Sequence, residues 1–105
     1  MSISSHVLDT SQGEPARGVP ITLERLDGGT WLVVAHGTTD DDGRLRDEGT
    51  FGPGRYRLVF DTATYLGPDA FFPEAIVVFQ ITDPGRHLHI PLLLSPFGLT
   101  TYRGS

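Results

Sequence analysis

Turn-forming residues recur along the whole chain, and the short spacing between them limits the possible folds more than any other feature of the sequence. The signals lie about ten to seventeen residues apart. They are Asp27-Gly28-Gly29, Asp42-Gly43, Pro53-Gly54, Gly67-Pro68, Pro84-Gly85 and Pro96-Phe97-Gly98. The segments between them are short and rich in Val, Ile, Leu, Phe, Tyr and Thr, residues that fit a pleated sheet. The sequence therefore predicts an all-β fold.

Eight short strands with no long helix are expected between these turns, a pattern typical of a sandwich of two sheets. The predicted strands cover residues 3–9, 20–26, 31–38, a short segment near Leu45, 55–61, 74–82, 87–94 and 99–104. One helical turn is predicted over residues 62–66, capped by Asp61 or Thr62. Residues 11–18 are predicted to form a loop.

Length and charge restrict the class of protein. The 105 residues suffice for a single domain spanning 1–105. All eight basic residues are arginines, and the net charge of -5 with no basic run argues against nucleic acid or an anionic membrane as partner. The chain lacks cysteine, a secretory signal pattern and any apolar run long enough to span a membrane. A cytoplasmic location is therefore expected.

Two strands place histidines on a face that is more apolar than a solvated surface requires. In the strand over 87–94, alternation assigns Leu88, Ile90, Leu92 and Leu94 to the core, and His87, His89, Pro91, Leu93 and Ser95 to the outer face. In the first strand, Ser4, His6 and Leu8 likewise share one face. Such outer faces predict a cleft or a subunit contact. The apolar run over 75–79 similarly predicts a strand buried between the core and another subunit.

Histidines are the natural general bases in this sequence, because their ordinary pKa lies near neutrality. His36 and His87 are expected to be structural or surface residues, whereas His6 and His89 have apolar neighbours on their own faces. A zinc site built from His6 and the His-x-His pair is an alternative. There is neither a cysteine nor a Gly-x-Ser-x-Gly elbow, so water activated by histidine is a simpler hypothesis than covalent catalysis.

Three consecutive aspartates, Asp40-Asp41-Asp42, precede Gly43 and allow two interpretations. Clustered carboxylates suit calcium, but the spaced ligands and terminal glutamate of a calcium-binding loop are missing. The simpler interpretation is a tight turn, in which Asp supplies side-chain hydrogen bonds and Gly adopts positive φ.

Several motifs together resemble a known family. They are His6-Val7-Leu8-Asp9-Thr10, Asp42-Gly43-Arg44, Phe72-Pro73-Glu74, His89-Ile90-Pro91-Leu92-Leu93-Leu94-Ser95-Pro96 and the final Tyr102-Arg103-Gly104-Ser105. In order and spacing the chain resembles, over essentially its whole length, the 5-hydroxyisourate hydrolases of the transthyretin-like family.

The resemblance implies a fold, an assembly and a site. The implied fold is a prealbumin-like (transthyretin-like) sandwich of two four-stranded sheets with one short helix, assembled as a homotetramer with active sites at the dimer–dimer interface. The implied catalytic residues are His6, Arg44 and His89, and the implied substrate-binding residues are Tyr102, Arg103, Gly104 and Ser105. Which histidine is the general base stays open.

The implied activity is hydrolytic ring opening of 5-hydroxyisourate to 2-oxo-4-hydroxy-4-carboxy-5-ureidoimidazoline, a step of urate catabolism, with no cofactor and no metal. Two other functions stay open. One is a non-catalytic carrier of an aromatic anionic ligand, and the other is an adhesion or interaction module with structural histidines.

Overall fold

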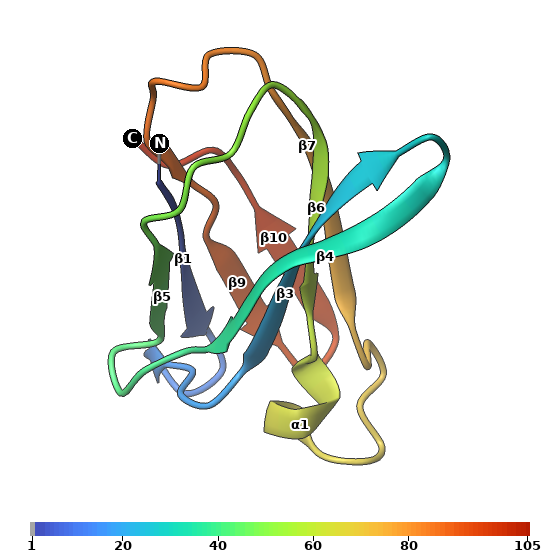
Figure 1. Cartoon of the computed structure of the whole chain (residues 1–105). Helices are drawn as coiled ribbons and strands as arrows, with labels where there is room; N and C mark the ends of the chain where they lie inside the picture. The colour runs from blue at the N-terminus through green and yellow to red at the C-terminus, as the bar shows by residue number, and fades with distance from the viewer. Residues whose placement is uncertain (1) are drawn as a thin grey trace.

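The computed structural model describes residues 2–105 and shows two β-sheets packed face to face, with one short helix at the end of the sandwich (Figure 1). The elements in order are β1 (Ile3–Asp9), β2 (Glu14–Pro15), β3 (Pro20–Asp27), β4 (Thr30–Thr38), β5 (Arg44–Asp47), β6 (Gly54–Phe60), α1 (Thr62–Leu66), β7 (Ala75–Ile81), β8 (Leu88–His89), β9 (Leu92–Ser95) and β10 (Gly98–Thr101). The all-β prediction and the two-sheet architecture are confirmed.

The first sheet is organised around β1. Along one edge β1 pairs antiparallel with β5 and then with β2, and along the other it pairs parallel with β8 and then with β9. β10 pairs antiparallel with β9. Six strands therefore fill a sheet that is four strands wide, in agreement with the predicted width.

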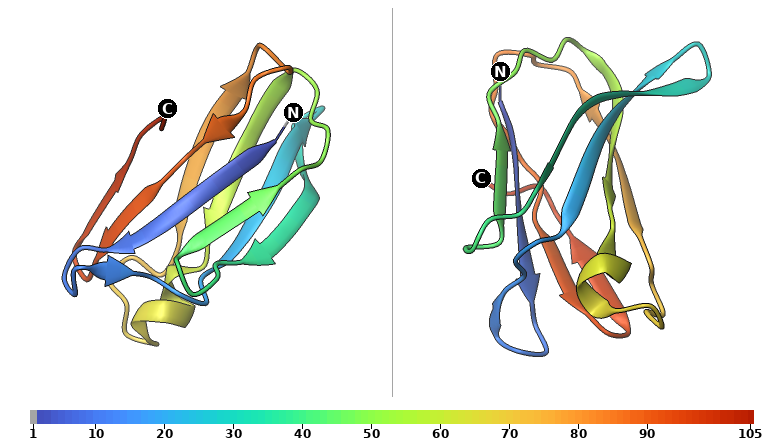
Figure 2. Two further views of the ribbon diagram at one scale, coloured as in Figure 1. Left: turned by 90° about the vertical axis from the view of Figure 1, so that its left-hand side faces the viewer. Right: turned by 60° about the horizontal axis from the view of Figure 1, so that its bottom comes forward.

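The second sheet is fully antiparallel, in the order β4-β3-β6-β7, and lies across from the first (Figure 2). A register shift between Leu23 and Glu24 marks an irregularity in the β3–β4 hairpin. The inward faces of both sheets form the hydrophobic core, which is built around Val7, Leu23, Tyr56, Phe60, Leu92 and Leu94. Burial of this core is the main driving force for folding.

The turn at the aspartates positions the start of β5. One carboxylate oxygen of Asp40 accepts hydrogen bonds from the backbone N–H groups of Asp42 and Arg44, both at 2.9 Å. Gly43 has a φ of 74°, and a Cβ there would lie 2.4 Å from the carbonyl oxygen of Val7. Only glycine fits such a position without strain. These contacts favour the turn interpretation of the aspartates.

Two sequence predictions were wrong in detail. The strand expected over 87–94 is interrupted between β8 and β9, and Pro91 is buried although alternation placed it on the outer face. Proline has no N–H to give to the ladder, so the strict alternation ends there. The loop expected over 11–18 contains β2, a two-residue strand.

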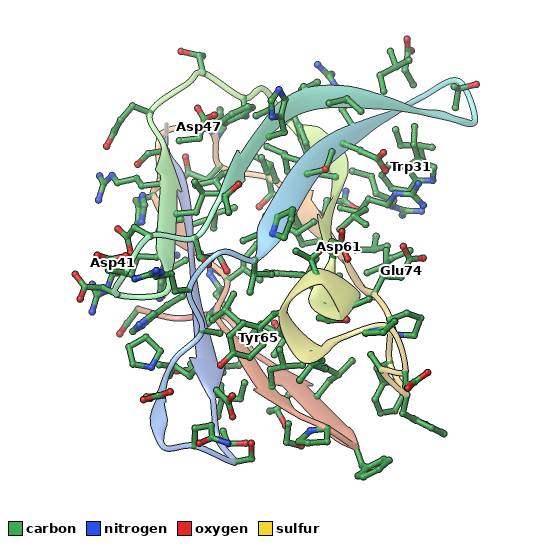
Figure 3. All side chains as sticks on the ribbon, turned by 90° about the horizontal axis from the view of Figure 1, so that it is seen from below. Trp31, Asp41, Asp47, Asp61, Tyr65 and Glu74 are labelled. Carbon is green, nitrogen blue, oxygen red and sulfur yellow. The ribbon has the colours of Figure 1, made fainter. Side chains whose placement is uncertain are left out.

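The predicted helical turn is confirmed as α1, and Asp61 caps it by accepting a hydrogen bond from the N–H of Thr64. From α1 the Tyr65 hydroxyl donates a 2.7 Å hydrogen bond to the carboxylate of Asp9 at the end of β1. Figure 3 views this end of the sandwich and labels Tyr65 beside the helix. Within residues 2–105, no helix is long and apolar enough to cross a membrane.

Candidate active site

The predicted catalytic residues meet on the outer face of the first sheet. Residues directly opposite each other on paired strands have side chains on the same face. His6 on β1 lies opposite Arg44 on β5. Two residues earlier, Ser4 lies opposite Arg46 on one side and opposite His89 of β8 on the other. The register of β1 therefore brings the three implied catalytic residues, His6, Arg44 and His89, onto one face of the sheet.

A cleft of about 280 Å³ opens on this surface. Its lining combines two guanidinium groups, two imidazoles and three hydroxyl-bearing residues. The lining residues are Ser4, Ser5, Arg44, Leu45, Arg46, His87, His89 and Ser105. Positive charge beside imidazole groups suits an anionic or electron-rich polar substrate.

His6 is held in one tautomer. Its Nε2 lies 2.8 Å from the backbone carbonyl oxygen of Asp42. A carbonyl oxygen can only accept a hydrogen bond, so Nε2 carries the proton. The neutral ring therefore has its lone pair on Nδ1.

His89 is half-buried and favours the neutral state. Burial is the largest cause that lowers its pKa, and the neighbouring His6, His87 and Arg44 lower the pKa further by charge repulsion. Its Nδ1 lies 2.8 Å from the Ser4 hydroxyl oxygen, which fixes the orientation of the ring. A neutral, oriented imidazole beside an arginine can act as a general base.

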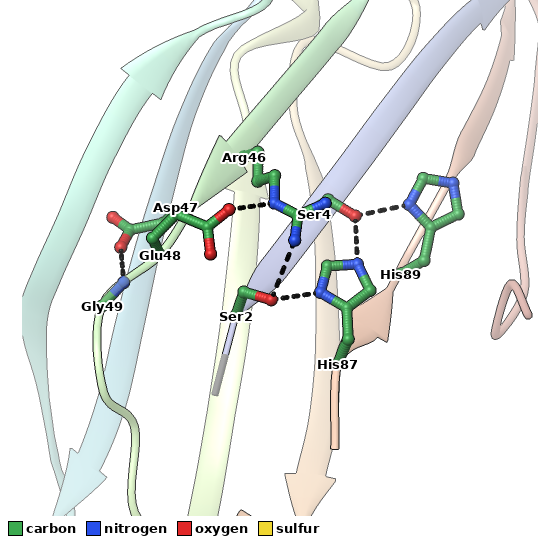
Figure 4. A network of polar contacts seen from close by, with 8 residues as sticks. All are labelled: Ser2, Ser4, Arg46, Asp47, Glu48, Gly49, His87 and His89. Atoms are coloured by element: carbon green, nitrogen blue, oxygen red, sulfur yellow. Dashed lines mark hydrogen bonds and ion pairs between the residues drawn. The ribbon is translucent and has the colours of Figure 1, made fainter. Parts of the chain in front are cut away.

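His87 belongs to the same polar network (Figure 4). Its Nε2 lies 2.9 Å from the Ser4 hydroxyl oxygen, and its Nδ1 contacts the Ser2 hydroxyl. The Arg46 guanidinium donates to the Ser2 hydroxyl at 3.5 Å and also pairs with Glu48. The imidazole of His87 itself is exposed at the rim of the cleft.

The final four residues, Tyr102 to Ser105, lie at two different cavities. The N–H of Gly104 donates a 2.7 Å hydrogen bond to the carbonyl oxygen of His89, and Ser105 lines the cleft. Tyr102 and Arg103 instead line a second cavity of about 310 Å³, beside β7. The described part of the chain thus brings Gly104 and Ser105, but not Tyr102 and Arg103, to the cleft.

Sequence reasoning did not assign several lining residues to the cleft, among them Ser4 and Arg46. His87 is exposed, as expected, but it also lines the cleft. Two-residue spacing from His6, Arg44 and His89 is the signal that could have found them, since residues two apart in a strand share a face. His36, the remaining histidine, is exposed on β4, in line with its expected surface role.

Among residues 2–105, no group of three or more histidine, aspartate or glutamate side chains is arranged to hold a metal ion. His6 and His87 already contact a carbonyl oxygen and two hydroxyls, respectively. The zinc alternative therefore receives no geometric support from these side chains.

The fold and the cleft together define a class of protein: a small two-sheet β-sandwich with a histidine- and arginine-lined site on the outer face of one sheet. A family model described as HIUase/Transthyretin family matches residues 3–104. The chain belongs to the HIUase/Transthyretin family.

Similar proteins include 5-hydroxyisourate hydrolases and a transthyretin solved in complex with thyroxine. The 5-hydroxyisourate hydrolase of Salmonella dublin is 43% identical over 109 residues, which cover 98% of this chain and 80% of that protein. The structure of Klebsiella pneumoniae 5-hydroxyisourate hydrolase superposes with a TM-score of 0.84 at 35% identity, covering 100% of both chains. Sea bream transthyretin in complex with thyroxine gives a TM-score of 0.88 at 34% identity, covering 97% of this chain and 93% of that one. The fold alone therefore does not decide the function.

Proposed function

We propose that this chain is a 5-hydroxyisourate hydrolase, which opens the ring of 5-hydroxyisourate to 2-oxo-4-hydroxy-4-carboxy-5-ureidoimidazoline in urate catabolism. The observation that carries this assignment is the cross-strand meeting of His6 with Arg44, one row from His89, on one surface. The hydrolases of Salmonella dublin and Klebsiella pneumoniae support it through nearly full-length similarity.

The cleft supports hydrolysis by activated water. A neutral imidazole, from His89 or from His6, takes a proton from water as the oxygen attacks a ring carbonyl, and such assistance is worth roughly 10²–10⁴ in rate. Arg44 faces the same cleft and stabilises the negative charge that develops on the carbonyl oxygen. Gly104 pairs with the backbone of His89, and Ser105 lines the cleft. The proposed reaction requires neither a metal nor another cofactor.

A carrier of an aromatic anionic ligand is the weaker alternative. Binding alone requires a shaped cavity and a counter-charge, but not a neutral base held in one orientation by a hydroxyl. The hydrogen bond between Ser4 and His89 and the lowered pKa of His89 fit catalysis better.

The oligomeric state, the cellular location and the kinds of partner are also proposed. Large apolar side chains remain exposed on the single chain, including Phe97 at 80% and Phe71 at 66%, which supports burial against other copies. We infer a homotetramer with active sites at the dimer–dimer interface, located in the cytoplasm. The net charge of -5 supports a protein that has neither nucleic acid nor membrane as partner.

The decisive measurement is the ultraviolet decay of 5-hydroxyisourate freshly generated from urate by urate oxidase. We expect the protein to accelerate the decay, the acceleration to survive treatment with a chelator, and the His89→Asn variant to lose it. A folded wild-type protein that leaves the spontaneous decay unchanged would contradict the assignment and favour the ligand carrier. Loss of activity on chelation would contradict the metal-free mechanism alone.

A further inference from the structure

Hydrolysis at a ring amide leaves a proton that must be disposed of. Water brings two protons: one ends on the ureido nitrogen, and the other is released because the new carboxylic acid ionises at neutral pH. If His89 takes up this proton, its imidazolium lies beside the permanent positive charge of Arg44. The proton therefore needs a route out of the cleft before the next turnover.

A continuous row of polar groups leads from His89 to the exposed rim (Figure 4). The Ser4 hydroxyl oxygen lies 2.8 Å from Nδ1 of His89 and 2.9 Å from Nε2 of His87. Nδ1 of His87 contacts the Ser2 hydroxyl, which also accepts from Arg46 at 3.5 Å. Each link in this row can both donate and accept, apart from the arginine, which only donates.

The number of protons available fixes the direction of the row when His89 acts as a base. A neutral imidazole has one N–H, so a lone pair on Nε2 requires the proton on Nδ1. Nδ1–H of His89 then donates to the Ser4 oxygen, and the Ser4 hydroxyl donates to Nε2 of His87. His87 in turn carries its proton on Nδ1 and donates to Ser2.

We propose that Ser4 and His87 form a proton relay that sets His89 as the general base through Nε2 and carries the released proton to solvent. When Nε2 of His89 takes a proton from water, Nδ1 passes its proton to Ser4 while Ser4 passes its own to Nε2 of His87. No charge remains on His89 or Ser4 after this step, and His87 becomes an imidazolium. The other proton of water passes to the ureido nitrogen as the ring C–N bond breaks. Exposed His87 then releases a proton to solvent, and exchange of the Nε2 proton of His89 with solvent returns that ring to the Nδ1–H tautomer before the next turnover. Ser4 and His87 are thus positioning residues that act through His89, and the proposal rests on the hydrolase function.

The surroundings of His89 favour this transfer. The charged and titratable groups that face it are His6 on β1, Arg44 on β5 and His87 next to it on its own segment. Burial and Arg44 both disfavour a cation at His89. His87 is exposed, so water stabilises the transferred charge.

Kinetics of Ser4 variants test the relay. Ser4→Ala is expected to lower kcat about tenfold with little change in KM, and to reduce the solvent deuterium isotope effect, since general acid–base steps contribute roughly 10²–10⁴-fold in full. Ser4→Thr keeps the hydroxyl and should restore both quantities, whereas His87→Gln should behave like Ser4→Ala. Ser95→Ala is the matched control, because the Ser95 hydroxyl bonds the carbonyl of Gly98 in the β9–β10 turn.

Nitrogen-15 NMR of the histidine rings tests the same proposal without substrate. Wild-type His89 should carry its proton on Nδ1, and Ser4→Ala should lose that preference while Ser95→Ala retains it. An inactive wild type would refute the hydrolase function, but the tautomer of His89 could still be measured by NMR. The relay would be wrong if Ser4→Ala kept the kcat, isotope effect and tautomer of the wild type, or if Ser4→Thr failed as badly as Ser4→Ala.

Discussion

His89 stays neutral near pH 7 because burial, aided by His6, His87 and Arg44, lowers its pKa below the ordinary value for histidine. The family motif pointed to His6, Arg44 and His89 from the sequence. The motif did not reveal Ser4, because its contact with His89 joins residues 85 apart and depends on the parallel register of β1 with β8.

The lowered pKa of His89 predicts the acid limb of the pH profile. A base works only when deprotonated, so kcat/KM should stay level as pH falls to 6.5 and should decline at lower pH. Folding stability should fall in the same direction, because the unfolded chain binds a proton on this histidine at a higher pH than the folded chain. A pH series of initial rates tests the first point, and an acid limb at or above pH 6.5 would contradict it.

Gly104 supports His89 by leaving room for it. A Cβ at Gly104 would lie 2.4 Å from Cδ2 of His89, so Gly104→Ala must displace the imidazole or the tail. We expect a roughly tenfold loss of kcat with the fold retained, since small displacements of a catalytic group are costly. Gly52→Ala is the control, because a Cβ there meets no atom of the described residues within 4 Å. Equal rates for the two variants would show that the close approach has no catalytic role.

Among the elements, α1 ties one end of the sandwich to β1 through Tyr65 and Asp9. Burial by itself raises the pKa of Asp9, but hydrogen bonds from Tyr65, Ser11 and the N–H of Gln12 more than offset it and leave the pKa below its usual value. Burial and the Asp9 carboxylate raise the pKa of Tyr65 to about 12. The sequence predicted the helix and its cap, because capping is local, whereas the bond to β1 spans 56 residues.

Removing this bond should lower stability and change its pH dependence. Tyr65→Phe is expected to cost about 2 kcal/mol of the free energy of unfolding, as for a hydrogen bond to a charged acceptor. Tyr65 contributes stability that is present below pH 10 and is lost as pH rises toward its folded pKa of about 12, so the variant should lose less stability over that range. Urea unfolding at pH 7 and above pH 10 measures both effects, with exposed Tyr102→Phe as control. Equal alkaline loss in the two variants would contradict this account.

The strand pattern shows where sequence reasoning succeeds at this scale. β1 matches its predicted bounds, because its alternation is regular and a turn follows it at Thr10. The interruption between β8 and β9 was missed because the apolar run continues across it, and Pro91 was the available signal.

At the scale of the whole molecule, the two-sheet sandwich followed from the turn spacing, but the arrangement of the strands did not. Turn spacing predicts eight short strands, close to the ten that form, whereas the parallel pairing of β1 with β8 and β9 is a long-range choice. Tyr102 and Arg103 illustrate the same limit, since their cavity beside β7 depends on how the final strand crosses the other sheet.

The proposed assembly makes a prediction of its own. The wild type should sediment with four times the 11.4 kDa mass of one chain. Phe97→Asp places a charge on a side chain that is 80% exposed in the single chain, so it should leave the fold intact and weaken the assembly. Analytical ultracentrifugation of both proteins, with exposed Asp69→Asn as the control, measures this. A wild type that remains monomeric at micromolar concentration and hydrolyses substrate would refute the assembly.

The parallel pairing of β1 with β8 also governs when the cleft can form during synthesis. Ser4 emerges from the ribosome first, and its partner His89 follows 85 residues later. Contacts of such long sequence separation slow folding and leave early segments exposed in the meantime. The second sheet, whose strands are joined in part by local hairpins, can form before β8 and β9 have been synthesised to pair with β1. A nascent chain should thus acquire β-structure well before it acquires hydrolase activity.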